Sequence, residues 1–212
     1  MDVMGAPRPH EALTVLRALE DLASADPLNV RGVLATLLTL DGALHERSGA
    51  TALFCDEAAA GAEGARNLTT LPDALRSEVE KSISAPSCAV VEFDLEEDET
   101  LFGPGGLAGK AEVLLEPLTG ELRDRLRQAR ETLLRGEGLV VELTLTGREA
   151  GQRRHFPPDH PAVKACYAEG APELEEVSER EGVRRVFSLP LIPMGKALLL
   201  GSGEDARRLA EI

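Results

Sequence analysis

Two segments of the sequence combine glycines with a cation in a pattern that could bind a phosphate. The first runs from Gly42 to Ala50 and contains Arg47 and Gly49; the second runs from Gly106 to Lys110 and contains Gly109. A cofactor with a phosphate tail needs backbone amides that approach closely and a few cations. Tight turns that need positive φ, with solvent-facing charges, explain the same residues without a ligand. From the residues alone, the turn interpretation is favoured.

The last residues of the sequence carry a second phosphate-binding pattern. Gly201, Gly203 and Ala206 have the form G-x-G-x-x-A, after a short apolar run and before a helical one. In a Rossmann fold these positions provide a tight turn, close approach to a pyrophosphate, and helix–strand packing. A full βαβ unit needs about 30 residues or more, and the sequence ends at Ile212. We therefore expect residues 196–212 to begin a truncated Rossmann domain that binds NAD(P) only when complete. An ordinary glycine-rich turn is the alternative.

Cysteines and histidines give no clear catalytic or metal-binding pattern. Cys55, Cys88 and Cys166 are an odd and scattered set, and none has a neighbouring His to activate it. His155 and His160 lie near Cys166, but their spacing matches no zinc signature. We predict no catalytic residue and no metal site from these side chains.

Charge and composition exclude several classes of partner. The chain has 212 residues and carries 23 Lys and Arg against 37 Asp and Glu, a net charge of −14. A net negative charge of this size repels nucleic acid and anionic membrane surfaces. The longest uncharged apolar stretch, Gly32 to Leu40, is too short to span a bilayer, and Arg8, Pro9 and His10 interrupt any signal peptide. We expect a cytoplasmic protein with no nucleic-acid and no membrane partner.

Hydrophobic periodicity indicates strands that alternate with helices. The strand at 139–146 should have one wet face, a polar helix is plausible at 173–181, and Pro190 and Pro193 indicate a linker. The acidic run from Asp94 to Glu99 should be a solvated hairpin end. The other expected helices are 9–25, 72–85 and 122–133, and the other strands are 33–40, 52–55, 89–93, 111–115 and 197–200.

These elements predict an α/β fold. We expect a mixed β-sheet flanked by helices over residues 1–192, followed by the incomplete Rossmann-like domain at 196–212.

The segment Leu34 to Leu53, LATLLTLDGALHERSGATAL, resembles the opening motif of the XdhC/CoxI family, the xanthine dehydrogenase accessory proteins. That motif is a buried strand followed by G-S-x-x-x-R-x-G-A. Ala43 replaces its usual Ser, and Ser48 replaces its usual Pro. The matching residues are Gly42, Arg47, Gly49 and Ala50.

A second segment, Gly106 to Leu118, is similar to the G-C-G-G motif of that family and its following strand. Gly106 and Gly109 match, while Leu107 stands where the Cys is expected. The family's Gly-Gly-Cys and acid are also missing from residues 64–72, around Thr70. The order of the later elements agrees from about Ala12 onward, so the chain resembles a divergent member.

The resemblance implies a maturation protein that is more a chaperone than an enzyme. Members of the family bind molybdenum cofactor and help deliver it, sulfurated, to hydroxylases of the xanthine dehydrogenase or carbon monoxide dehydrogenase type. The implied partners are the molybdenum hydroxylase apoenzyme and a sulfur-transferring enzyme, with a homodimer left open. The two glycine segments would then hold the cofactor. The alternatives are an NAD(P)-dependent oxidoreductase in its intact form, and a degenerate interaction subunit that binds no ligand.

Overall fold

The computed structural model describes residues 31–41, 48–55, 65–67, 73–84, 86–95, 109–179 and 182–193. The predicted helix at 9–25 and the predicted Rossmann opening at 196–212, with Gly201, Gly203 and Ala206, lie outside these residues. Gly42, Arg47 and Gly106 lie outside them as well. The division into two domains therefore stays a prediction.

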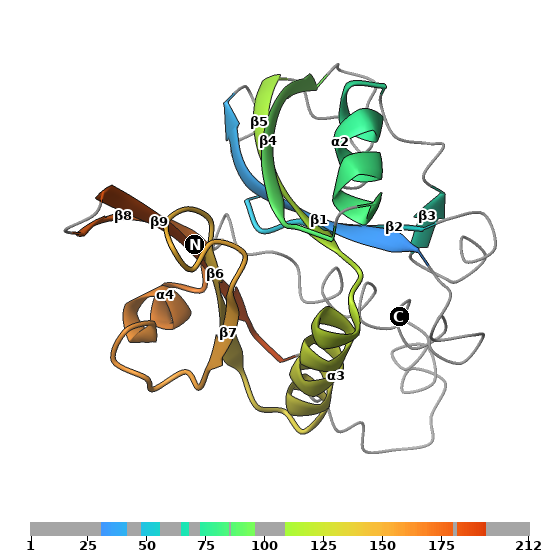
Figure 1. The fold of residues 1–212 in the computed structure, drawn as a ribbon. Helices are drawn as coiled ribbons and strands as arrows, with labels where there is room; N and C mark the ends of the chain where they lie inside the picture. Colours follow the sequence, from blue (N-terminus) through green and yellow to red (C-terminus); the bar gives the residue numbers. More distant parts are fainter. Residues whose placement is uncertain are drawn as a thin grey trace, which may run out of the picture.

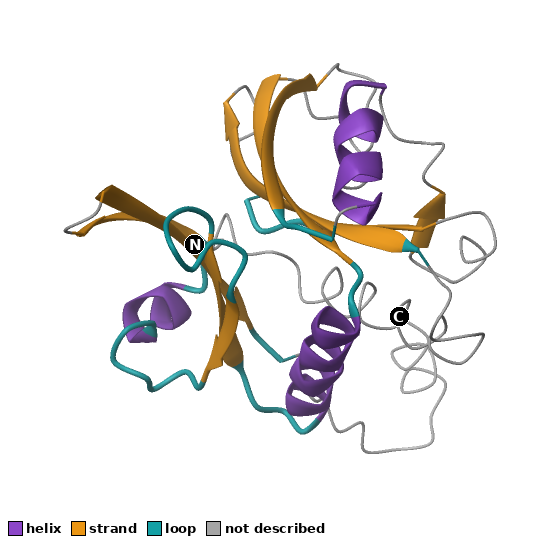
Figure 2. Ribbon diagram, in the orientation of Figure 1, coloured by secondary structure: helices purple, strands orange, loops and turns teal. Residues whose placement is uncertain are grey.

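A five-stranded mixed sheet contains the strands predicted in the first half of the chain (Figures 1 and 2). Its order is β3-β2-β1-β5-β4, and β3 runs parallel to β2 while the other neighbours are antiparallel. Helix α2 (Asp73–Ser84) packs on one face. The strands are β1 (Gly32–Asp41), β2 (Thr51–Cys55), β3 (Ala65–Asn67), β4 (Ala89–Leu95) and β5 (Gly109–Pro117). The α/β class with a mixed sheet is confirmed.

A second, fully antiparallel sheet follows helix α3 (Gly120–Leu134), and its order is β7-β6-β9-β8. The sequence predicted one sheet, but α3 separates β5 from β6 and the later strands pair only with one another. The short helix α4 (Lys164–Glu169) lies between β7 and β8. The strands are β6 (Leu139–Thr144), β7 (Arg153–Phe156), β8 (Glu173–Glu179) and β9 (Gly182–Leu191).

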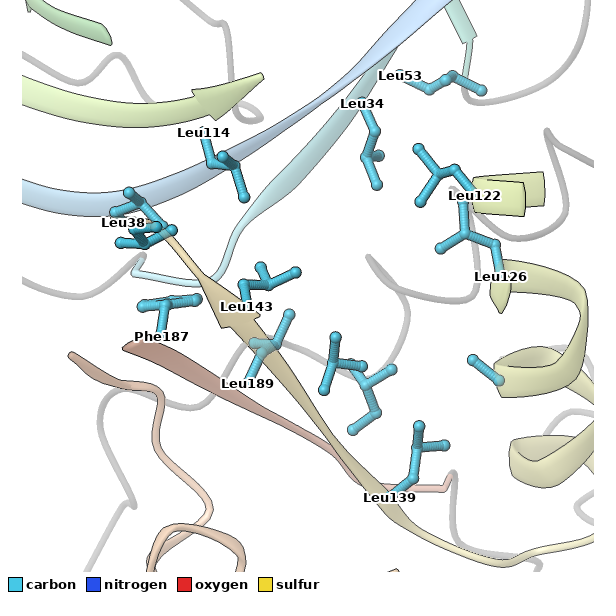
Figure 3. Close-up of a cluster of buried hydrophobic side chains, with 14 of the residues drawn as sticks. Leu34, Leu38, Leu53, Leu114, Leu122, Leu126, Leu139, Leu143, Phe187 and Leu189 are labelled. Carbon is cyan, nitrogen blue, oxygen red and sulfur yellow. The ribbon is translucent and has the colours of Figure 1, made fainter. Parts of the chain in front are cut away.

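One apolar core joins the two sheets and α3, as Figure 3 shows. Side chains from β1, β5, β6, β9 and α3 point toward one another there, among them Leu34, Leu38, Leu114, Leu122, Leu126, Leu143, Phe187 and Leu189. A second core lies on the other face of β1, where Val33, Ala35 and Leu37 meet Leu75 and Val79 of α2. Strand β1 is therefore buried on both faces, which confirms the interpretation of its continuous apolar run.

The predicted polar helix at 173–181 is wrong, because residues 173–179 form strand β8. This strand pairs with the basic strand β9, which places Glu176 opposite Arg185 and Val177 opposite Arg184. Leu174 packs against the main core. Opposite charges across the ladder and one partly buried apolar side chain outweigh the helix propensity of the glutamates.

Two further expectations for the second sheet are also wrong. The supposedly wet face of β6 is covered, since Val140 is 0% exposed against Val163 and Cys166, and Thr144 is 2% exposed. Pro190 belongs to β9 rather than to a linker, and it lies opposite Val140. Strand β8 begins at Glu173, opposite Ser188, so no β8 residue pairs with Pro190 and the missing N–H of the proline is tolerated there.

Among the residues described, no helix is both long and apolar enough to cross a membrane.

Candidate functional site

Strand topology places Asp41, the residue before the first glycine segment, beside Lys110 of the second segment at one edge of the five-stranded sheet. Strand β1 ends at Asp41, next to Gly42, whereas Gly49 and Ala50 lie beside Leu37, four residues back along β1. Because β5 is antiparallel to β1, its first residues lie at the same edge, and Lys110 stands opposite Asp41. Segments more than 50 residues apart in sequence therefore leave the sheet at neighbouring positions.

Gly49 closes the turn that leads into β2. Its N–H donates to the Leu37 carbonyl at 2.7 Å, and the Leu37 N–H donates to the Ala50 carbonyl at 2.9 Å. Its φ is +85°, and a Cβ there would lie 2.6 Å from Leu189 Cδ1 and 2.8 Å from Pro172 Cγ. Turn geometry and close packing both require glycine at this position, and its amide is already used within the protein.

Lys110 is the exposed cation at this edge among the described residues of the two segments. Strand β5 begins at Gly109, whose φ is +130°, and the next residue pairs in register with Asp94 of β4. Asp94 is exposed too. A phosphate at this edge could therefore bind the Lys110 ammonium, but it would lie near a carboxylate.

The opposite end of the same sheet carries a cleft of about 490 Å³, which we call the α3 cleft. Its walls come from the start of β4, the end of β5, the first turns of α3 and the β6–β7 connection. The lining residues are Pro86, Cys88, Glu116, Pro117, Thr119, Glu121, Leu122, Arg125, Ala150, Gly151, Gln152, Arg153 and Arg154. These residues are scattered from 86 to 154 and form no sequence motif, so sequence analysis missed them.

A buried ion pair lies in the lining of the α3 cleft. Arg153 Nε donates to Glu116 Oε1 at 3.0 Å, and its Nη2 donates to Oε2 at 2.6 Å. The two side chains are 9% and 5% exposed. Arg185 and Glu112 form a similar two-bond pair at 2.6 and 2.7 Å. Both pairs join β5 to the second sheet and fix the relative position of the two sheets.

Cys88 lies in the α3 cleft, yet its thiol is a poor nucleophile. Desolvation of the thiol by the surrounding protein atoms and the charge of Glu116 raise the pKa of Cys88 to about 11, although the residue is exposed, so the thiol is protonated at neutral pH. Cys55 and Cys166 are buried. Burial and nearby glutamates also raise the pKa of Cys166 to about 11.

The histidines occupy separate positions. His155 lies on β7 opposite Val141, and its Nε2 has no hydrogen-bond partner within the described ranges. Burial, followed by the charges of Arg153 and Arg125, lowers the pKa of His155 to about 4. His160 stacks on Phe156 with ring centroids 4.4 Å apart. In the part of the chain that the structure describes, no three His, Cys, Asp or Glu side chains gather as a metal site.

The fold resembles that of a solved protein, although sequence comparisons find no relative. No family model matches the sequence, and no curated protein matches it either. A crystal structure described as a xanthine dehydrogenase from Bacillus halodurans aligns with a TM-score of 0.50 and 20% identity, over 83% of this chain and 53% of the other. The chain therefore spans about half the length of that solved chain, and the likeness establishes the fold.

Proposed function

We propose that this protein is an accessory protein that binds molybdenum cofactor and assists its delivery to a molybdenum hydroxylase of the xanthine dehydrogenase or carbon monoxide dehydrogenase type. The observation that carries the proposal is the pairing of Asp41, which precedes the first glycine segment, with Lys110 of the second segment at one sheet edge. Those are the segments that resemble the XdhC/CoxI motifs. The fold likeness to a protein described as a xanthine dehydrogenase agrees with this class.

The chain's own residues have distinct tasks in this proposal. Lys110 donates to the phosphate of the cofactor, and Arg47 supplies a second cation from the other segment. Gly49 and Ala50 hold the turn through their hydrogen bonds to Leu37. The exposed Lys110 ammonium fits a phosphate, whereas the occupied Gly49 amide does not serve as a donor. When bound, the cofactor supplies the molybdenum centre that the hydroxylase requires.

Sulfuration of the cofactor depends on another protein in this proposal. Leu107 stands where the family motif has a Cys, and the three cysteines of the chain are either buried or protonated at neutral pH. A thiolate is the form that accepts and transfers sulfur. We therefore assign the sulfur-carrying cysteine to a separate sulfur-transferring enzyme. The apo-hydroxylase is the partner that receives the cofactor from this protein.

The test is retention of molybdenum cofactor by the purified protein after production in a host that makes the cofactor. Lys110→Gln should retain roughly tenfold less cofactor than the wild type, because one charge-assisted contact is lost. Lys81→Gln is the matched control, since Lys81 is an exposed lysine of α2 that pairs with Glu78. Equal retention by both variants would remove Lys110 from the site. No retention by the wild type would favour a degenerate interaction subunit.

A further inference from the structure

The α3 cleft is a separate candidate site, remote from the glycine segments. Strand β5 begins at the glycine edge with Gly109, and its last residues, Glu116 and Pro117, line the cleft. At about 3.3 Å per residue, this nine-residue strand separates the two places by roughly 25 Å. A ligand in the cleft would therefore be independent of the proposed function and of the residues that carry it.

The cleft reverses the charge balance of the chain. The whole protein carries a net charge of −14, whereas the cleft is lined by three arginines and two glutamates. Glu116 is neutralised by its two bonds from Arg153. Arg154 donates to Glu149 at 2.8 Å, so its charge is also matched nearby. Arg125 and Glu121 are the remaining charged pair of the lining.

Arg125 is positioned to bind an anion. Its Nη2 lies 3.9 Å from Glu121 Oε1, which is beyond hydrogen-bond distance, and the two side chains are 41% and 83% exposed. An ion pair of this kind, exposed and long, contributes little and is readily displaced. The positive charge of Arg125 also helps to lower the pKa of His155, which lies on β7 of the second sheet. The first turn of α3 adds its partial positive charge at the same place, with Thr119 as N-cap.

The rest of the lining adds a small apolar surface beside the arginine. Pro86 and Ala150 expose apolar surface, Pro117 and Leu122 are buried behind it, and Gln152 contributes a side-chain amide. The volume is within the range of ordinary small-molecule sites. We propose that the α3 cleft binds an organic phosphate monoester, with its phosphate on Arg125 and its apolar part against Pro86 and Ala150.

Titration calorimetry with phenyl phosphate tests this proposal on the full chain. Arg125→Gln should weaken binding about tenfold or more, because a charge-assisted contact to the phosphate is lost. Arg127→Gln is the matched control: Arg127 is on the same helix, exposed, bonded to Asp124, and absent from the lining. The control should bind as the wild type does. Equal affinity for both variants, or no binding by the wild type, would overturn the proposal.

Two comparison ligands separate the contributions of charge and apolar surface. Phenol should bind at least tenfold more weakly than phenyl phosphate, because it lacks the anionic group. Inorganic phosphate should also bind more weakly, because it leaves the apolar wall unused. Phenol binding as tightly as phenyl phosphate would contradict the role of Arg125. Phosphate binding as tightly would contradict the monoester class.

Two further measurements do not depend on the heat of binding. Cys88 is the exposed cysteine in the cleft, while Cys55 and Cys166 are buried. At about pH 9, where a small fraction of the Cys88 thiol is ionised, bound phenyl phosphate should therefore slow its alkylation by iodoacetamide in the wild type and in Arg127→Gln. The effect should be smaller in Arg125→Gln at the same ligand concentration. Glu121→Gln should strengthen binding, since it removes the carboxylate nearest Arg125. An unchanged alkylation rate at saturating ligand, or weaker binding by Glu121→Gln, would place the ligand elsewhere.

Discussion

Arg153 of β7 and Glu116 of β5 are bonded to each other by two hydrogen bonds, 3.0 and 2.6 Å long, across the junction of the two sheets. Glu116 shares its face of β5 with Leu114 and Glu112. Leu114 belongs to the main core, and Glu112 is bonded to Arg185 of β9. One strand face therefore supplies an apolar contact between two ionic contacts to the second sheet.

Glu116→Gln should destabilise the protein strongly. The substitution keeps the shape of the side chain but leaves the charge of Arg153 buried without its counter-charge, which costs about 3–5 kcal/mol. For a chain of this size, the midpoint of thermal unfolding should fall by roughly 6–20 °C. Glu137→Gln is the control, because the Arg135–Glu137 pair is exposed and should contribute at most about 1 kcal/mol. Calorimetry measures the unfolding midpoints of both variants. Equal midpoints would show that the buried Arg153–Glu116 pair contributes no more to stability than the exposed Arg135–Glu137 pair.

Gly49→Ala should destabilise the protein, whereas Gly120→Ala should not. Gly49 has a φ of +85° and lies against Leu189 and Pro172, so an alanine costs about 1–2 kcal/mol in backbone strain in addition to the steric clash. Gly120 is the first residue of α3 and has nothing within 4 Å of an added Cβ. Alanine there should be neutral or stabilising by up to about 1 kcal/mol. Denaturant titration of the two variants measures the difference, and similar stabilities would show that Gly49 is not constrained.

His155 should make the protein less stable in mild acid. Burial and the charges of Arg153 and Arg125 lower its pKa from 6.5 to about 4, so the unfolded chain binds this proton more readily than the folded one. The contribution to stability is full above pH 6.5 and is lost as the pH falls from about 6.5 to about 4. Unfolding midpoints measured over this window should fall more steeply for the wild type than for His155→Leu. Parallel curves would show that His155 is not held in its neutral form.

The sequence predicts those elements whose signals are local. The uninterrupted apolar run at 33–40 identifies β1, and the apolar positions Leu122, Leu126, Ala129 and Leu133 identify the buried face of α3. Strand β8 was predicted wrongly because its glutamates are stabilised by arginines of β9, and that pairing is tertiary. The covered face of β6 depends in the same way on α4, a helix of six residues with no strong periodic signal.

The candidate sites show the same difference between local and tertiary signals. The two glycine segments are visible as sequence patterns, and the antiparallel pairing of β1 and β5 places Asp41, just before the first segment, opposite Lys110 of the second. The interpretation of Gly49 as a turn glycine needs Leu189 and Pro172, which are more than 120 residues away. Arg153 and Glu116 are 37 residues apart and have no spacing that would predict their contact.

The most direct test of the proposed function is a titration of molybdenum cofactor into the wild type, Arg47→Ala and Glu97→Ala. A charge-assisted contact to the cofactor's phosphate contributes about 1.5 to 3 kcal/mol, so Arg47→Ala should weaken binding by roughly 10- to 150-fold. Glu97→Ala, in the acidic run, should bind nearly as tightly as the wild type. Equal affinity for all three proteins would remove the first glycine segment from the site, and no binding by the wild type would contradict the proposed function itself.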